Sequence, residues 1–208
     1  MKLKNIKDEY DAIFSLGNQC FVANKLQQYN LRLYAGVIDW MISFSLLHVI
    51  KLLQNQFKDF MKKENMIFTG YHAYGKKLLL KDIKYEIDSA HDFLVTENTP
   101  TDLKTYAEFK TILDRRIQRF LTKLNTCQKI LFVRIGGTYE EAKQLEIVLS
   151  KMIQSEFRVL LINKIDKYEI VEYDWDLLYT CSVGIPMDGN QNHEIWDQLL
   201  KGISHSNI

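Results

Sequence analysis

The sequence has almost no excess of one charge. Its 208 residues include 27 Lys and Arg against 26 Asp and Glu, which gives a formal net charge of +1. Proteins that bind nucleic acid or anionic membranes generally present a basic excess, because attraction to phosphate groups dominates that kind of affinity. The charge balance therefore favours a peptide or small-molecule substrate over nucleic acid or a membrane.

The sequence also lacks a long apolar segment. The longest apolar run beside a predicted helix, Met41 to Ile50, contains Ser43, Ser45 and His48 and is too short to cross a bilayer. Charged residues interrupt the opening stretch MKLKNIKDEYDAIF, so it does not resemble a secretory signal, and we expect the mature chain to begin there. These absences predict a cytoplasmic protein without membrane spans.

Cysteine is scarce and widely spaced. Cys20, Cys127 and Cys181 fit neither a disulfide framework nor a zinc site, which predicts free thiols in a reducing compartment and no bound metal. Cys127 follows a predicted helix and Cys181 lies in an apolar run, so both have structural explanations. Neither GxGxxG nor GxxxxGK[ST] occurs, and we therefore expect no cofactor.

The apolar patterns that are present predict an α/β fold. A strand, helix, strand order is typical of parallel sheets, and it occurs in KILFVRIGG, a helix over about 138–154, and FRVLLINK. We expect a single domain, residues 1–208, with a mostly parallel central sheet flanked by helices and a β-hairpin-rich insertion. The other predicted elements are strands at 11–16 and 177–185, two or three strands within 66–93, a polar hairpin at 164–173, a helix starting at Cys20, and helices at about 43–61, 102–124 and 192–203.

Polar residues lie at the carboxyl ends of the predicted parallel strands, where ligands bind in open sheets. They are the turn Gly17 to Cys20, then Arg134, then Asn163. Cys20 begins a predicted helix, whose positive end stabilises a thiolate, and the turn before it offers amides for an oxyanion. We expect Arg134 and Asn163 to point into the same crevice as Cys20. The alternative is that Cys20 is an ordinary buried residue.

His91 is the histidine best placed to act as a base. It lies at a predicted strand end, and a neutral imidazole near pH 7 can take a proton from a thiol. Asp92 is a weaker candidate to orient it, because neighbouring strand residues point to opposite faces. The remaining histidines have structural explanations. We expect core packing for His48, a hairpin surface for His72, an exposed helix start for His193 and a fraying tail for His205.

Asp39 and Trp40 form an unusual polar and aromatic pair inside the apolar stretch GVIDWMI. A buried carboxylate needs hydrogen-bond partners, so we predict that Asp39 is at least partly buried and accepts two or more hydrogen bonds. It either orients the imidazole or holds its own loop. A second polar group, the basic cluster of Arg115, Arg116 and Arg119, is interpreted as a solvated helix face with local ion pairs.

Five segments together resemble an uncharacterised bacterial family described as putative papain-like cysteine peptidases. They are SLGNQC, LRLYAGVIDWMIS, SAHDF, DRRIQRF and ILFVR, and they are spread over most of the chain. The sequence has Val37-Ile38 where the family commonly has Pro-Phe before Asp-Trp. The resemblance implies a peptidase-like activity in which Cys20 is the nucleophile and His91 is the base. The matching ranges are Ser15–Cys20, Arg32–Trp40, His91–Phe93, Arg115–Phe120 and Phe132–Arg134.

Two functions of different classes are compatible with these residues. The first is a cysteine-dependent hydrolase or acyl transferase with catalytic Cys20, His91 and Asp39, in which Asn163 is an alternative to Asp39 as the group that orients the imidazole. Its substrate-binding or oxyanion residues would be Asn18, Gln19, Trp40, Arg134 and Asn163. The second is a non-catalytic ligand-binding or interaction domain, in which Cys20 is packed and a polar ligand is held at the sheet edge by Arg134, Asn163 and Asp39. Contact between the Cys20 sulfur and a His91 nitrogen would favour the first.

Overall fold

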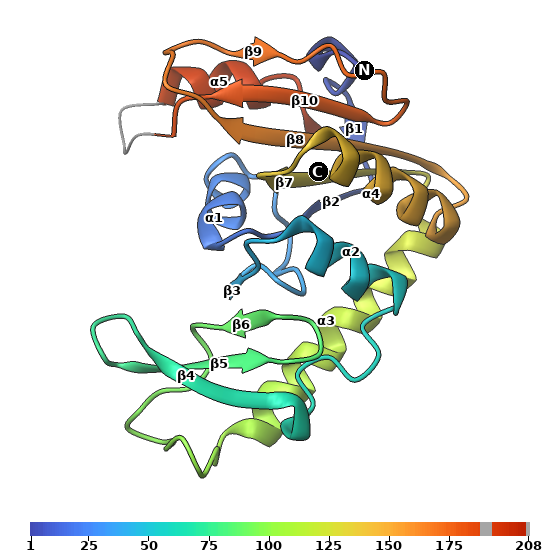
Figure 1. The fold of residues 1–208 in the computed structure, drawn as a ribbon. Helices are drawn as coiled ribbons and strands as arrows, with labels where there is room; N and C mark the ends of the chain where they lie inside the picture. The colour runs from blue at the N-terminus through green and yellow to red at the C-terminus, as the bar shows by residue number, and fades with distance from the viewer. Residues whose placement is uncertain (188–192, 207–208) are drawn as a thin grey trace.

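The computed structural model describes residues 1–187 and 193–206 and has the mixed α/β architecture predicted from the sequence. Its central sheet has five strands in the order β2-β7-β8-β10-β9 (Figure 1). Four of them are parallel, and the short edge strand β9 is antiparallel to β10. The mostly parallel sheet is therefore confirmed. The bounds are β2 Ala12–Ser15, β7 Lys129–Ile135, β8 Glu156–Lys164, β9 Val171–Glu172 and β10 Thr180–Ile185.

Helices cover both faces of this sheet (Figure 1). One face, which includes Phe14 and Phe132, packs against α2, α3 and α4, and the other, which includes Val133 and Cys181, packs against α1 and α5. Burial on both faces explains why the parallel strands are nearly continuous apolar runs in the sequence. The bounds are α1 Cys20–Gln28, α2 Leu46–Gln54, α3 Tyr106–Thr126, α4 Tyr139–Met152 and α5 His193–Leu200.

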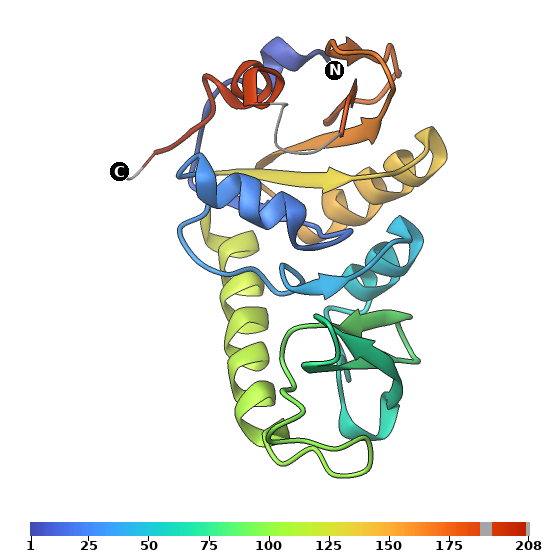
Figure 2. The same cartoon turned by 90° about the vertical axis from the view of Figure 1, so that its left-hand side faces the viewer.

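A second sheet is antiparallel and has four strands in the order β3-β6-β5-β4. It corresponds to the hairpin-rich insertion that the sequence predicts. The long helix α3 runs beside this sheet and continues to the parallel sheet, so it connects the two (Figures 1 and 2). The loop that contains His91 directly follows β6, so the antiparallel sheet positions His91. The bounds are β3 Met41–Ile42, β4 Met66–His72, β5 Lys77–Asp82 and β6 Ile87–Ser89.

Residues 204–206 do not fray as expected. The strand β11 (Ser204–His205) pairs with β1 (Glu9–Tyr10) in parallel. His205 is 8% exposed, and its Nε2 lies 3.0 Å from the carbonyl oxygen of Leu31. Strand pairing and burial hold this segment, so the prediction of a fraying tail is wrong. The remaining short elements are the 3-10 helices η1 Leu3–Asn5 and η2 Lys63–Asn65.

Two predicted elements differ from the structure. The helix predicted over about 43–61 is shorter, because Gln56, Phe57, Asp59 and Met61 have positive φ and form tight turns that still bury apolar side chains. The predicted hairpin at 164–173 is absent from the described residues, because β9 pairs with β10 and not with β8. The predicted start of the last helix, Asn192, lies outside the described residues. No helix in the described ranges is long and apolar enough to cross a membrane.

Candidate active site around Cys20 and His91

Cys20 is the first residue of α1 and follows a tight turn after β2. Gly17 and Asn18 have φ of 79° and 90°, a left-handed backbone that reverses the chain between the strand and the helix. The N-cap residue Gln19 makes no side-chain capping bond, so no side chain at this position satisfies the first N–H groups of the helix. The Cys20 thiol is partly exposed at the positive end of α1.

The other two thiols are buried. Burial raises the pKa of Cys127, and it raises the pKa of Cys181 to about 12. Both residues therefore stay protonated and packed near pH 7, as the sequence predicts. Of the three cysteines, Cys20 is the one that is partly exposed.

Arg134 is fully buried and holds the turn before α1 in place. Its Nη1 donates to the carbonyl of Leu16 (2.8 Å) and to Ser43 Oγ (3.1 Å), and its Nη2 donates to the carbonyls of Ser43 (2.7 Å) and Phe44 (3.0 Å). Ser43 Oγ in turn accepts from the backbone N–H of Asn18 (3.1 Å). Burial lowers the pKa of Arg134 to about 10. Arg134 is therefore a positioning residue whose N–H groups bind protein atoms.

The side-chain amides of Asn18 and Asn163 also bind protein atoms. Asn18 Nδ2 donates to the carbonyl of Ile135 (3.0 Å), and Asn163 exchanges two hydrogen bonds with the backbone of Gly137 (3.1 and 3.0 Å). Arg134 and Asn163 do end neighbouring parallel strands, but each braces a loop. That both share one crevice with Cys20 stays a prediction.

A cavity of about 260 Å³ borders the Cys20 turn. It lies at the carboxyl ends of β7 and β10, the edge at which open parallel sheets bind ligands. Gln19 is exposed there, and its amide makes no capping bond. This cavity is thus a space beside the Cys20 turn in which a substrate could be held. Its lining consists of Asn18, Gln19, Phe21, Ile135 and Met187.

His91 lies in the loop after β6 and contacts two other rings. Its ring centroid is 5.0 Å from that of His72 and 6.1 Å from that of Trp40, and Lys77 Nζ donates to its carbonyl oxygen (2.6 Å). Burial lowers the pKa of His91 below its ordinary value of 6.5, and the charges of Lys77 and His72 lower it further. The imidazole is therefore neutral at pH 7, which is the form that can accept a proton.

Asp39 is almost completely buried, at 1% exposure, as the sequence predicts. Its Oδ2 accepts the backbone N–H of Gly36 (2.7 Å) and pairs with Arg32 Nε (3.2 Å), whereas Oδ1 is buried without a hydrogen-bond partner among the described residues. The carboxylate thus has one hydrogen bond and one ion pair, not the two or more hydrogen bonds predicted. Burial raises the pKa of Asp39, and the Gly36 N–H and Arg32 oppose that rise. These contacts hold the loop that Asp39 belongs to, and none of them reaches His91.

The short segment from Trp40 to Ser43 connects the surroundings of Cys20 and His91. Trp40 contacts the His91 ring, and the Ser43 N–H donates to the carbonyl of Asn18 (2.9 Å), two residues before Cys20. The strand β3 of this segment lies between α1 and β6 (Figures 1 and 2). Within the described residues no hydrogen bond joins Cys20 to His91. The segment therefore links the surroundings of the two residues, although Cys20 and His91 do not bond directly.

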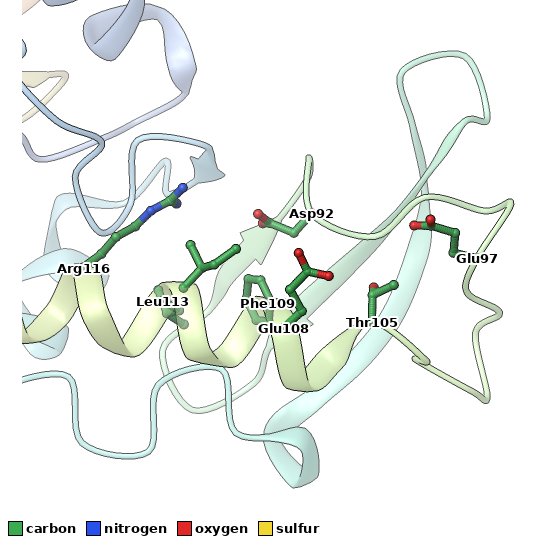
Figure 3. A pocket seen from close by; sticks show the side chains of 8 residues that line it. Asp92, Glu97, Thr105, Glu108, Phe109, Leu113 and Arg116 are labelled. Carbon is green, nitrogen blue, oxygen red and sulfur yellow. The ribbon is translucent and has the colours of Figure 1, made fainter.

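Two arginines of the basic cluster are not a solvated face. The Arg119 guanidinium donates to the carbonyl of Ala35 (2.6 Å) and lies over the Tyr34 ring, and Arg116 is half-buried and lines the same cavity as Asp92 (Figure 3). Only Arg115 is exposed as predicted. The helical period of the sequence shows which residues share a face of α3. It does not reveal that the loop after Arg32 and the loop after β6 cover that face.

Comparison with known proteins places the chain in a family. The family model described as "Putative papain-like cysteine peptidase" matches residues 11–167. The chain belongs to this family. The matched residues run from the start of the parallel sheet to just beyond β8 and include Cys20, Trp40, His91 and Arg134. Searches of curated proteins and of solved structures gave no match.

Proposed function

We propose that this family member is a cysteine-dependent hydrolase or acyl transferase with Cys20 as its nucleophile. The observation that carries the proposal is the partly exposed thiol of Cys20 at the start of an α-helix whose N-cap side chain makes no bond. The dipole and free N–H groups of such a helix end stabilise a thiolate, and the thiolate is the reactive form of cysteine. Membership of a peptidase-like family supports a peptide as the substrate.

In the proposed reaction the Cys20 thiolate attacks a carbonyl carbon and forms a tetrahedral intermediate. Backbone N–H groups at the start of α1 and the exposed amide of Gln19 are the donors nearest to the developing oxyanion. Collapse of the intermediate expels the leaving group and leaves a thioester on Cys20. Water or another acceptor then attacks the thioester, releases the acyl group and restores the thiol. The three free cysteines of the chain are consistent with work in the reducing cytoplasm.

We assign the role of base to His91, whose imidazole is neutral at pH 7. Catalytic hydrogen bonds are often long in the free protein, so the proposal requires the Trp40 and His91 side chains to approach Cys20 whenever its thiol reacts. The segment from Trp40 to Ser43 supports this coupling, because it contacts both residues' surroundings. Asp39 has a supporting role as the anchor of the loop that leads to Trp40.

A p-nitrophenyl ester tests the proposal directly. We expect a burst of p-nitrophenolate and an acyl adduct on the Cys20 peptide in mass spectrometry. Cys20→Ser should abolish both, since a hydroxyl is a much weaker nucleophile at this position. Cys127→Ser is the matched control and should keep the adduct, because the Cys127 thiol is buried. An adduct that persists in Cys20→Ser would contradict the proposal.

A second candidate function is a non-catalytic ligand-binding domain. The absence of a Cys20–His91 hydrogen bond among the described residues favours it. Arg134 cannot hold the polar ligand in this case, because its N–H groups already bind protein atoms, whereas the Asn163 amide keeps one donor and one acceptor site beyond its two bonds to Gly137. Folded wild-type protein in which Cys20 forms no adduct and alkylates only after denaturation would select this function.

A further inference from the structure

A second cavity lies between the loop after β6 and the first half of α3, and its volume is about 210 Å³ (Figure 3). Four charged side chains surround it, namely Asp92, Glu97, Glu108 and Arg116. Figure 3 shows Arg116 at one end of this row and Glu97 at the other. The cavity therefore has a cationic end and an anionic end, so a ligand with two opposite charges would bind in one orientation.

No ion pair joins these four side chains to one another or to any other part of the described chain. Arg116 is half-buried and makes no hydrogen bond within those residues, and Asp92 and Asp39 attract it without forming an ion pair with it. Burial lowers the pKa of Arg116, and the charges of Asp92 and Asp39 oppose that change. A partly buried guanidinium without a direct partner is costly unless a group from outside the chain binds it.

The floor of the cavity is apolar. Ile112 and Leu113 lie three and four positions after Phe109 on α3, so all three side chains are on the same side of the helix. Phe109 and Leu113 are buried, and Ile112 is partly exposed toward the cavity. This floor matches a short chain of methylene groups, because such a chain gains from losing contact with water.

We propose that this cavity binds a small zwitterion that carries a carboxylate at one end and an ammonium at the other, separated by a short aliphatic chain. The carboxylate pairs with Arg116, the ammonium pairs with Glu97 and Glu108, and the methylene groups cover the apolar floor. An ω-amino acid has this chemistry, and so does a lysine residue at the free carboxyl end of a peptide. The site is separate from the Cys20 turn and does not depend on the proposed reaction.

Two simpler ligands fit the cavity less well. A plain anion would bind Arg116 but would be repelled by the three carboxylates, and a plain amine would leave Arg116 unpaired. Pockets for drug-sized ligands measure about 300–1,000 Å³, so a volume of about 210 Å³ suits a molecule the size of one amino acid. The zwitterion satisfies both ends of the cavity at once.

Calorimetric titration with three probes tests the proposal. We expect 6-aminohexanoate to bind about tenfold more tightly than hexylamine, because it gains a charge-assisted hydrogen bond to Arg116, and hexanoate to bind least. Arg116→Gln should reduce the ratio of the two affinities to about one. Because both ligands are measured on the same variant, a change in stability does not imitate this result. An acetylated peptide that ends in a free Lys, compared with its C-terminal amide, distinguishes a peptide end from a free amino acid.

Arg115→Gln is the matched control, since Arg115 is the neighbouring residue of α3 and is exposed away from the cavity lining. It should keep the preference for 6-aminohexanoate. The proposal is overturned if no probe binds the wild type, if hexylamine binds as tightly as 6-aminohexanoate, or if Arg116→Gln keeps the preference.

Discussion

Among the residues near Cys20, Arg134 has the contacts that are most costly to lose. Arg134→Met would leave the carbonyl groups of Leu16, Ser43 and Phe44 without this donor in a buried site. We expect it to lower the free energy of unfolding by about 3 kcal/mol or more, because each unsatisfied buried acceptor costs about 1–3 kcal/mol. Arg134→Lys should lose less, since an ammonium can still donate to some of these groups. Urea denaturation at pH 7 measures both, and an Arg134→Met variant as stable as the wild type would contradict this role.

The pKa of His91 is a second prediction at the residue scale. Burial and the nearby positive charges of Lys77 and His72 hold it below 6.5. In the pH window just below 6.5 the unfolded chain therefore binds more protons at this residue than the native protein does, so stability rises with pH through that window and falls in acid. NMR titration of the His91 imidazole should give a midpoint below 6.5, and His91→Gln should flatten the pH dependence of stability there. A midpoint above 6.5 would disprove this prediction.

For single residues, the sequence indicated which ones are buried or begin a helix, but it did not indicate which residues they contact. The start of a helix at Cys20 and the burial of Asp39 follow from local patterns, and the structure bears them out. The contacts of Arg134 with Ser43, and of His91 with His72, join segments far apart in the chain, and a single sequence carries no signal for them. A buried Arg at the end of an apolar strand was the one clue that it would need several acceptors. The catalytic roles stay predictions.

At the scale of secondary-structure elements, the N-terminus of α4 is capped by a side chain and the N-terminus of α1 is not. Thr138 and Glu141 form a capping box at α4, whereas Gln19 makes no capping bond at α1. We expect Gln19→Asp to stabilise the protein by about 1 kcal/mol by accepting a free N–H of α1. The same carboxylate should slow alkylation of Cys20 at pH 7, because it repels the thiolate.

Two further variants separate capping from charge. Gln19→Ser adds a cap without a charge and should slow Cys20 alkylation less than Gln19→Asp does. Thr138→Ala removes the cap of α4 at a cost of about 1 kcal/mol and should leave the Cys20 rate unchanged. Chemical denaturation and timed alkylation give both quantities. Equal alkylation rates in the wild type and in Gln19→Asp would mean that the helix end does not activate the thiol.

Long elements with a strong apolar period could be predicted from the sequence, and short ones could not. The helix predicted at 102–124 is α3, and the strand, helix, strand unit is β7, α4 and β8. The end of α2 was missed because tight turns after Gln54 also bury Phe57, Phe60 and Met61, which imitates helical spacing. The pairing of β9 with β10 is a contact between strands, and no local pattern encodes it.

At the scale of the whole molecule, the two sheets carry different parts of the candidate site. The parallel sheet positions the Cys20 turn after β2, and the antiparallel sheet positions the loop after β6, which contains His91. Figure 1 shows the two sheets. The mixed α/β class and the mostly parallel sheet were predicted correctly, because alternating strands and helices leave few alternative topologies. How closely the second sheet approaches the first depends on packing along α3 and could not be predicted. That the 208 residues form a single domain stays a prediction.

The central claim is that Cys20 is an activated nucleophile served by His91, and the rate of alkylation by iodoacetamide tests it most directly. At pH 7 the folded protein should react at Cys20 faster than at Cys127 or Cys181, both of which are buried. His91→Ala should slow the reaction of Cys20, whereas the control His48→Ala, on α2, should not. If Cys20 reacts only after denaturation, or if His91→Ala leaves its rate unchanged, the account of the active site is wrong.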